Sequence, residues 1–501
     1  MITDARQFKC SKFMHTFWSK LAFEVYFLDC LPKSMNFAEA RFWGLLLAGL
    51  AIITLLRFLL RFIKGFNREG FDKLSLLCLG LFLLLCISRV TFIIFLVVAV
   101  GSYAGLQWVL KHEESKQRRY LYVLIPLQLL PLAYYKYANF AVNQVLGFDI
   151  ATLHNLIIPV GISFYSFQKV AFVVDTLVFK QPLPRFLDYL NFAGFFPQIV
   201  AGPIERRRDL LPQMEQFRFR WSAANLNEGA GWVALGLFFK LCLADNLAFF
   251  FDGASSSNAY LIWMNNLIFG LRIYYDFAGY SLVALGLGRC LGVKLTLNFC
   301  SPYCSTSMVE FWRRWHITLS QWFRDYVYIP LGGGRVRWWA FNVALVFVVS
   351  GIWHGAGWNF VLWGAIHGVA LIVNRLWGAK LKLPAFFSWL LTMLTSFCAW
   401  LFFYETRTDV LVLKMKSLFT PGAYGHAAWQ EAAGQYLSPN GLVLACFLAL
   451  TGLVLLLEWL SIARHDAPYY FLRRPVVAAV LIVLTVMLAP EKNNGFIYFA
   501  F

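Results

Sequence analysis

Three of the eight histidines in this chain lie outside polar or loop-like segments and could take part in chemistry: His316, His354 and His367. Burial disfavours the charged form of an imidazole, and a neutral imidazole can act as a general base toward an attacking hydroxyl group. The alternative for each is a buried histidine that is only hydrogen-bonded to a neighbouring helix. The other five are interpreted as solvated loop residues: His15, His112, His154, His426 and His465.

The segment at residues 351–368, GIWHGAGWNFVLWGAIHG, contains two of these histidines. His354 directly follows an apolar run at residues 341–352, and the glycines at 351, 355 and 357 leave space for a substrate or another backbone. On one straight helix, His367 would lie roughly opposite His354. A helix break at residues 355–357 is therefore required to bring the two side chains together.

The segment at residues 311–334, FWRRWHITLSQWFRDYVYIPLGGG, combines charged residues with many aromatic rings. Interpreted as one helix, it has an aromatic side facing lipid or protein and a polar side, with His316 at the boundary. This pattern predicts either an interfacial anchor or the lining of a wet cavity, where arginines such as Arg314 hold a phosphate or carboxylate. Pro330 and the glycines at 332–334 are expected to end the helix. The aromatic side holds Trp312, Trp315, Leu319, Trp322, Phe323 and Tyr326, and the polar side Arg313, Arg314, Ser320, Gln321, Arg324 and Asp325.

One further carboxylate, Asp276 in YYDFAGYS, follows an apolar run. It could orient a histidine or pair with an arginine, and a plain helix-packing or capping role is the alternative. The sequence contains no phosphate-binding Gly-Lys-Ser/Thr loop, no His-Glu-x-x-His helix and no Gly-x-Ser-x-Gly elbow. The scattered cysteines indicate neither a disulfide framework nor a zinc site, and no metal is required.

The composition indicates that these residues are positioned by membrane helices. Of the 501 residues, 60% are hydrophobic and only 14% are charged, and the mean hydropathy is +0.61. Roughly 20 apolar residues cross a bilayer core of about 30 Å, which predicts an all-α polytopic membrane protein with about 10 to 12 embedded helices, some of them re-entrant. Residues 76–110 are interpreted as two short spans because Arg89 lies near their middle. The clearest apolar runs are 42–60, 76–100, 121–133, 232–251, 341–352, 386–403, 442–460 and 476–488.

The net charge of +18 fits the same interpretation. The basic residues cluster in short loops between apolar runs, as in Arg206, Arg207 and Arg208, and such loops usually stay on the cytoplasmic side or contact anionic lipid headgroups. Binding to nucleic acid has no further support. Residues 1–34 lack a signal-peptide pattern and are interpreted as an amphipathic extension or a doubtful start, while residues 35–501 form one membrane domain.

These motifs closely resemble the membrane-bound O-acyltransferase (MBOAT) family, and in particular its bacterial branch of alginate O-acetylation proteins. The resemblance rests on FWRRWHITLSQWFRDYVYIPLGG and SGIWHGAGWNFVLWGAIHG, and it covers roughly residue 35 to the C-terminus. Residues 1–34 match nothing in the family. The supporting segments are IPVGISFYSFQ (158–168), FPQIVAGPIER (196–206), YYDFAGYSLVALGLG (274–288) and FIYFAF (496–501).

The resemblance implies a ring of tilted helices around a central tunnel, in the bacterial cytoplasmic (inner) membrane. It implies transfer of an acetyl group from a cytoplasmic thioester, acetyl-CoA, toward an extracellular polysaccharide, completed by a periplasmic acetyltransferase partner. His354 corresponds to the catalytic histidine of the Trp-His-Gly motif, where it is expected to act as general base, with an acyl-histidine intermediate as an alternative. His316 corresponds to the second characteristic histidine. The further substrate and tunnel candidates are Asp276, Arg314, Trp353, Asn359 and His367.

Three other interpretations remain open at the level of sequence. A cousin subfamily that transfers D-alanine to teichoic acids shares the two histidine motifs, although IPLGGGR after the helix favours the acetylating branch. A transporter or flippase would also bury polar residues and interrupt its helices with glycine. A scaffold for a secretion complex would leave the acylation to partner proteins.

Overall fold

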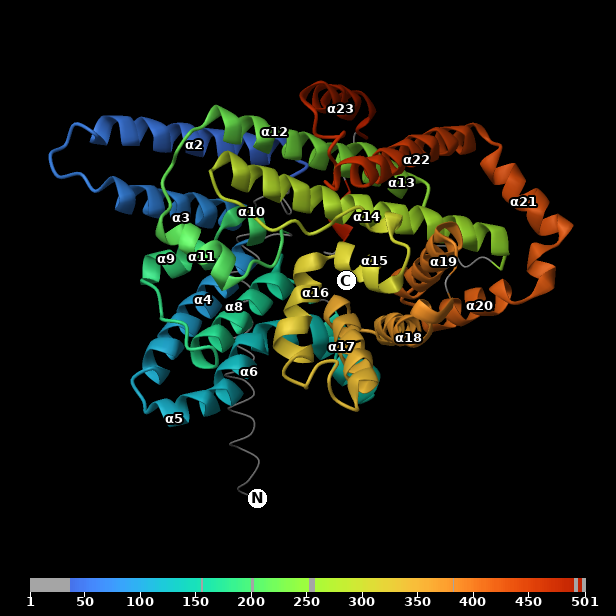
Figure 1. Cartoon of the computed structure of the whole chain (residues 1–501), viewed down its shortest axis with the longest axis horizontal. Helices are drawn as coiled ribbons and strands as arrows, with labels where there is room; N and C mark the ends of the chain where they lie inside the picture. The colour runs from blue at the N-terminus through green and yellow to red at the C-terminus, as the bar shows by residue number, and fades with distance from the viewer. Residues whose placement is uncertain are drawn as a thin grey trace, which may run out of the picture.

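The structure, a computed structural model, describes residues 37–154, 156–199, 202–251, 257–381, 383–490 and 494–497. Regular secondary structure within these residues is helical throughout, and they contain no strand (Figure 1). The all-α fold class is therefore confirmed. The extension expected at residues 1–34 lies outside the described residues, as do the last four positions of the FIYFAF segment.

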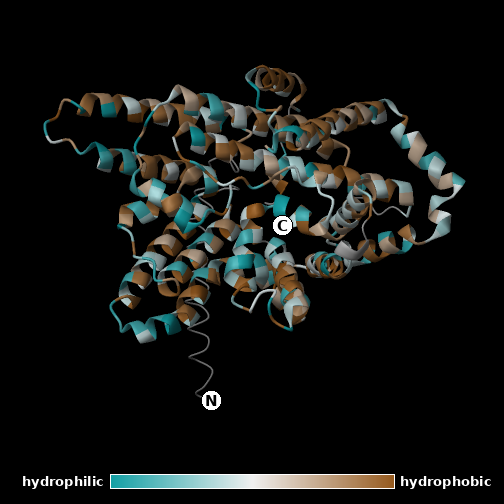
Figure 2. Cartoon of the chain, in the orientation of Figure 1, coloured by the Kyte–Doolittle hydropathy of each residue, from teal (hydrophilic) through white to brown (hydrophobic). Residues whose placement is uncertain are grey.

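Seven of the described helices are long and apolar enough to cross a membrane, and two shorter apolar helices accompany them. Figure 2 shows apolar residues along most of these helices, with polar residues gathered at loops and helix ends. The polytopic membrane architecture is thus confirmed, whereas the central tunnel stays a prediction. The seven are α2 (Ala40–Leu60), α3 (Arg68–Ile87), α4 (Arg89–Val109), the continuous unit Ala223–Phe249, α18 (Trp358–Leu381), α19 (Ala385–Tyr404) and α22 (Pro439–His465), and the shorter pair are α17 (Trp339–His354) and α23 (Pro475–Leu488).

The apolar stretch at residues 76–110 forms two helices, as predicted. The break lies at Ser88, whose extended backbone ends α3 and whose hydroxyl accepts a hydrogen bond from the Thr91 amide at 3.2 Å. Arg89 opens α4. A serine N-cap supplies one of the acceptors that the first turn of a helix needs, so a polar pair inside an apolar run is enough to divide it.

The helix α6 (Leu121–Leu132) continues into the π-helix η2 (Ala133–Tyr137). Pro126 and Pro131 lie inside α6, where a proline lacks the amide that an α-helical hydrogen bond requires. Single π-helical turns often occur at functional sites. This turn carries Lys136, a buried cation in an otherwise apolar and aromatic segment.

The longest helix, α14 (Ala259–Cys290), lies beside α12 (Ala223–Leu237) in the interior (Figure 1). Glycines bring the two backbones together: a Cβ at Gly236 would lie 2.7 Å from the Gly279 carbonyl oxygen, and one at Gly279 would lie 2.8 Å from the Gly236 carbonyl oxygen. Small residues at a helix contact allow such close packing in membranes. α14 was not expected as one long helix, because Arg272 and Asp276 interrupt its apolar run.

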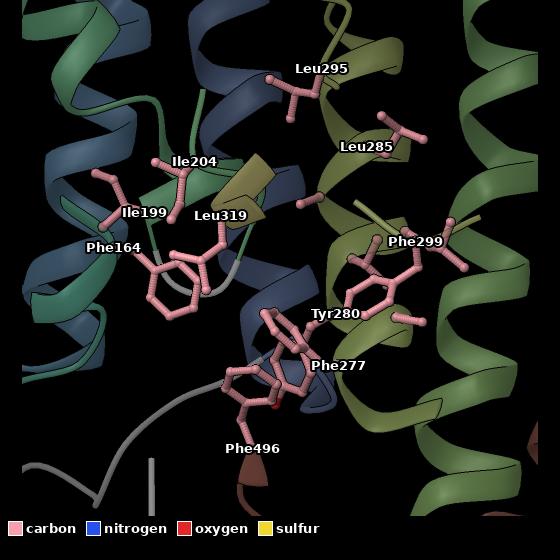
Figure 3. Close-up of a cluster of buried hydrophobic side chains, with 14 of the residues drawn as sticks. Phe164, Ile199, Ile204, Phe277, Tyr280, Leu285, Leu295, Phe299, Leu319 and Phe496 are labelled. Atoms are coloured by element: carbon pink, nitrogen blue, oxygen red, sulfur yellow. The ribbon is translucent and has the colours of Figure 1, made fainter. Parts of the chain in front are cut away.

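A buried charged group holds the middle of α14 in place. The Lys240 ammonium lies 2.8 Å from an Asp245 carboxylate oxygen and 2.6 Å from one of Asp276. The second Asp276 oxygen accepts a hydrogen bond from the Ile497 amide at 2.7 Å. Beside this contact, Phe496 packs against Tyr280 and Phe277 of α14, with ring centroids 4.4 and 5.5 Å apart (Figure 3). The C-terminal segment is therefore part of the core.

The other described helical elements connect these spans, form parts of them or cover the site. Among them, α8 contributes almost all of its residues to the interior. They are α5 (Glu114–Gln117), η1 (Arg118–Tyr120), η3 (Phe140–Val145), α7 (Ala151–His154), α8 (Ile162–Leu177), α9 (Phe186–Ala193), α10 (Phe196–Ile199), α11 (Arg207–Glu215), η4 (Phe238–Ala244), α13 (Asp245–Phe249), η5 (Pro302–Cys304), α15 (Met308–Arg314), α16 (Ile317–Phe323), η6 (Arg324–Tyr328), α20 (Thr408–Leu418), η7 (Pro421–Tyr424) and α21 (His426–Tyr436).

Candidate active site

The segment that carries His316 is broken into two helices, so the single helix expected from its periodicity is wrong. α15 ends at Arg314, and α16 begins at Ile317 after His316, whose φ of +42° is left-handed. A left-handed residue other than glycine is uncommon and persists where its surroundings hold it. The end of the segment agrees with the prediction, since η6 stops at Tyr328, two residues before Pro330.

The side chain and backbone of Asn298 hold this break. Its Oδ1 atom accepts hydrogen bonds from the Thr318 hydroxyl at 2.9 Å and the Thr318 amide at 3.3 Å. The same oxygen lies 3.1 Å from Nδ1 of His316, and the Asn298 carbonyl accepts from the Ile317 amide at 2.9 Å. Because an amide oxygen only accepts, Nδ1 of His316 carries the hydrogen. In the neutral ring Nε2 is then the basic nitrogen, and it has no hydrogen-bond partner among the described residues.

The aromatic side of this segment faces protein, which was one of the two orientations expected. Trp312, Trp315 and Trp322 are all buried, whereas Arg313 and Arg324 are exposed. Arg314 is bound elsewhere, with its guanidinium 2.8 Å from a Glu310 carboxylate oxygen. The aromatic rings therefore pack within the protein and do not form a lipid anchor. No described contact joins the Arg314 side chain to His316 or His354.

His354 is the last residue of α17, and the chain turns before α18 begins at Trp358. The predicted break at residues 355–357 is thus confirmed. The two helices pack closely, since a Cβ at Gly351 would lie 2.2 Å from the Phe360 carbonyl oxygen. The turn places Trp363 between the two histidines of this segment, with its ring centroid 4.9 Å from that of His354 and 4.8 Å from that of His367.

The two histidine motifs meet in the interior. The ring centroids of His316 and His354 lie 6.4 Å apart, and both residues are buried. Trp353 and Phe403 pack against His354 with centroids 4.8 and 5.4 Å away. Residues 38 positions apart in the sequence thus form one group of two imidazoles enclosed by aromatic rings.

Three of the segments that support the family resemblance converge on this group. Phe164 of α8 packs against Trp353, with centroids 5.5 Å apart, and Phe277 of α14 lies 4.7 Å from His316. The Ile204 amide donates to the Thr318 hydroxyl at 3.0 Å, which ties residues 196–206 to α16. These motifs, which are far apart in the sequence, therefore lie close together around the two histidines.

Two residues that the sequence analysis missed hold the end of α17. The Lys136 ammonium donates to the carbonyl oxygens of Trp353 and His354, each at 2.8 Å. The Tyr137 hydroxyl donates to the Ile352 carbonyl at 3.0 Å. A cation near the C-terminus of a helix is favoured by its dipole, and the last four carbonyls of a helix lack partners within it. A lysine inside an apolar, aromatic run was the available signal, because polar residues at membrane depth are functional candidates.

The other predicted residues take separate positions. The Asn359 amide donates to the Phe402 carbonyl at 3.0 Å, next to the ring of Phe403. His367 contacts Trp312, with centroids 5.0 Å apart. Asp276 is paired with Lys240, so it neither orients a histidine nor pairs with an arginine through a described contact. Within the described ranges, no group of three or more His, Cys, Asp or Glu side chains is arranged to hold a metal ion.

Comparison with known proteins agrees with this geometry. Residues 74–413, more than half of the chain, match the model of the MBOAT, membrane-bound O-acyltransferase family. The chain belongs to this family and is an O-acyltransferase, as its motifs predicted.

Named relatives lie within the same family. The chain is 35% identical to the peptidoglycan O-acetyltransferase of Helicobacter pylori, over 69% of this chain and 74% of that protein. It is 34% identical to the probable alginate O-acetylase AlgI of Pseudomonas syringae pv. tomato, over 71% of each chain. The teichoic acid D-alanyltransferase of Bacillus subtilis is 29% identical, over 46% of this chain and 62% of that protein.

Proposed function

We propose that this protein transfers acetyl groups from a cytoplasmic thioester, acetyl-CoA, across the bacterial inner membrane for the O-acetylation of a cell-surface polysaccharide. The observation that carries this proposal is the buried pair of imidazoles, His316 and His354, at the end of α17. The names of the relatives support acetyl as the group, because the O-acetylating relatives align over a larger share of the chain than the D-alanylating one.

In the proposed reaction His354 acts as general base. It takes the proton of the acceptor hydroxyl while the hydroxyl oxygen attacks the thioester carbonyl carbon. The carbon–sulfur bond then breaks, and the thiolate takes up the proton that His354 had accepted, so that an ester and a free thiol are the products. The basic Nε2 of His316 is suited to accept a hydrogen bond from the acceptor or to hold it in place.

The surroundings of the two histidines support this chemistry. Aromatic rings exclude water from the histidines, which protects the thioester from hydrolysis and strengthens electrostatic interactions within the site. Trp353, Asn359 and His367 are proposed as substrate or tunnel lining around them. A periplasmic acetyltransferase partner is proposed to complete the transfer to the polymer.

The test compares a knockout strain with knockouts carrying the native gene, His354→Ala or His426→Ala. His426 is an exposed histidine at the start of α21 and serves as the matched control. Mild base releases ester-linked groups from the extracellular glycans, and mass spectrometry identifies them, after immunoblots confirm that each protein reaches the membrane. We expect acetate to be lost in the knockout and with His354→Ala, and to return with the native gene and with His426→Ala.

Other outcomes would replace the proposal. Loss of D-alanine instead of acetate would identify the teichoic acid activity. Full restoration of acetate by His354→Ala would remove the catalytic role of this histidine and favour a scaffold whose partners perform the acylation. Unchanged ester content in all strains would favour a transporter.

A further inference from the structure

A large apolar cavity lies apart from the two histidines. It has a volume of about 810 Å³ and is bounded by α14, α19 and α22, with Tyr303 and Cys304 of η5 at one side. Neither His316 nor His354 lines it. Tilted aromatic rings lie between the two places, since Tyr303 contacts Trp315 and Trp315 contacts Trp400, with centroids 6.2 and 5.0 Å apart. The cavity is therefore a second site.

The wall of this cavity contains one buried amide that the fold leaves unsatisfied. Asn266 of α14 is 0% exposed, and neither its Nδ2 nor its Oδ1 atom has a hydrogen-bond partner among the described residues. An unsatisfied buried polar group costs about 1–3 kcal/mol, so such a group in a native protein calls for an explanation. Nearby, the Thr451 hydroxyl donates to the Phe447 carbonyl at 2.7 Å and keeps its oxygen available as an acceptor.

The rim of the cavity is apolar and exposed. Phe386 and Leu394 of α19 and Trp459 of α22 line it and are 61%, 47% and 53% exposed. Both helices are long and apolar enough to span a membrane, and exposed apolar residues on a spanning helix are those available for contact with lipid. Ligand pockets of this size are typically apolar with a few polar groups that fix orientation.

We propose that this cavity binds one acyl chain of a membrane glycerophospholipid and that the Asn266 amide donates a hydrogen bond to the ester carbonyl of that chain. The apolar walls match the hydrocarbon, and the ester supplies the acceptor that Asn266 lacks. Water is a poor occupant, because a buried water needs two to four polar partners and the walls are mainly Leu, Met, Phe and Trp. The proposal is independent of the reaction at His354.

The experiment uses the full-length protein in nanodiscs that contain phosphatidylethanolamine with a diazirine in one acyl chain. After irradiation, peptide mapping locates the cross-links. Gly452→Trp fills the cavity, since Gly452 lines it and a Cβ there would meet nothing within 4 Å. Leu453→Trp is the matched control, because this neighbour is 52% exposed and does not line the cavity. Asn266→Leu removes the amide and breaks no described hydrogen bond.

In the native protein we expect the cross-links to concentrate on the cavity-lining segments of α19 and α22. Gly452→Trp should lower their yield at least fivefold, Asn266→Leu several-fold, and Leu453→Trp less than twofold. Equal cross-link yields in the native, Gly452→Trp and Leu453→Trp proteins would overturn the proposal that the acyl chain binds in this cavity. A normal cross-link yield with Asn266→Leu would overturn the proposed hydrogen bond between the Asn266 amide and the ester carbonyl. A diazirine-bearing polyprenyl phosphate that displaces the phospholipid at equal concentration would overturn the glycerolipid assignment.

Discussion

The backbone of His354 is held by side chains from a distant turn. Lys136 and Tyr137 together bind the carbonyls of the last three residues of α17. The imidazole itself packs against the rings of Trp353, Trp363 and Phe403. The position of the proposed base therefore depends on two polar side chains that lie outside its own motif.

We predict that Lys136→Met lowers the rate of acyl transfer by roughly 10- to 100-fold, because it removes both hydrogen bonds to the end of α17 and a displacement of a reacting group by about 1 Å can cost on the order of 100-fold in rate. Lys136→Arg should recover much of the rate, and Lys116→Met, which removes an exposed lysine paired with Glu113, should leave it unchanged. Turnover in nanodiscs of the proposed donor, acetyl-CoA, separated into kcat and KM, is the measurement. A loss confined to KM, or none at all, would contradict a positioning role.

A second residue, Glu205, is expected to make the folding stability depend on pH. Glu205 is buried in the loop before α11, and burial raises the pKa of its carboxyl to about 7, although hydrogen bonds from the Thr296 amide and hydroxyl act in the opposite direction. The folded pKa exceeds the unfolded value of 4.5, so the folded protein binds the proton more tightly. The contribution of Glu205 to stability is therefore most favourable at and below pH 4.5 and becomes less favourable as pH rises to 7, by about 3 kcal/mol.

We therefore expect the thermal midpoint of the native protein in detergent to fall between pH 5 and pH 8 relative to that of Glu205→Gln. Glutamine keeps an oxygen to accept from Thr296 and does not titrate. Midpoints are read from intrinsic tryptophan fluorescence. Parallel curves for the two proteins would show that this carboxyl is ionised in both the folded and the unfolded state over that range, so that its folded pKa is not raised.

At the scale of helices, the contact between α12 and α14 depends on glycine. Gly279→Ala places a methyl group 2.8 Å from the Gly236 carbonyl oxygen and 3.0 Å from the Lys240 amide nitrogen. Overpacking of this kind costs about 1–3 kcal/mol. Gly101→Ala in α4 is the control, since its Cβ would meet nothing within 4 Å and alanine favours a helix. We expect only the first variant to lower the thermal midpoint, and equal midpoints would show that the helices adjust at little cost.

Helix boundaries were predictable from the sequence where nearby residues determine them. The two spans at residues 76–110 are divided by a serine cap, and the break after His354 follows from three nearby glycines. The break at His316 was not predictable from periodicity, because Asn298, which stabilises it, lies 18 positions earlier in the sequence. α14 was missed because Arg272 and Asp276 interrupt its apolar run, and the ion pair of Asp276 with Lys240 exists only in the folded protein.

At the scale of the whole molecule, the sequence identified the two histidines of the candidate site but not what surrounds them. Family motifs pointed to His316 and His354, and the structure places their rings together. Asp276 was expected to orient a histidine, pair with an arginine or serve in helix packing, and Arg314 to hold an anionic group; Asp276 pairs with Lys240 and Arg314 with Glu310. Such pairings depend on tertiary packing, which a single sequence does not display.

The C-terminal segment offers a test at this scale. Phe496 packs on Phe277, and Phe277 packs on His316. Truncating a buried phenylalanine to alanine costs about 3–5 kcal/mol in soluble cores. We predict that Phe496→Ala lowers both the thermal midpoint and acetyl transfer, while Phe496→Leu retains most of both. Normal activity of Phe496→Ala at normal stability would show that this packing does not reach the histidines.

The hydrogen bond between Asp276 and Ile497 also has a consequence for biogenesis. Translation proceeds from the N-terminus, and 221 residues separate the two partners. The ribosome must therefore deliver the chain as far as residue 497 before this carboxylate can acquire that donor. Until then, nascent chains hold Lys240 and Asp276 without their contacts to residues 494–497. A chain released before these residues lacks the contacts that close this part of the interior.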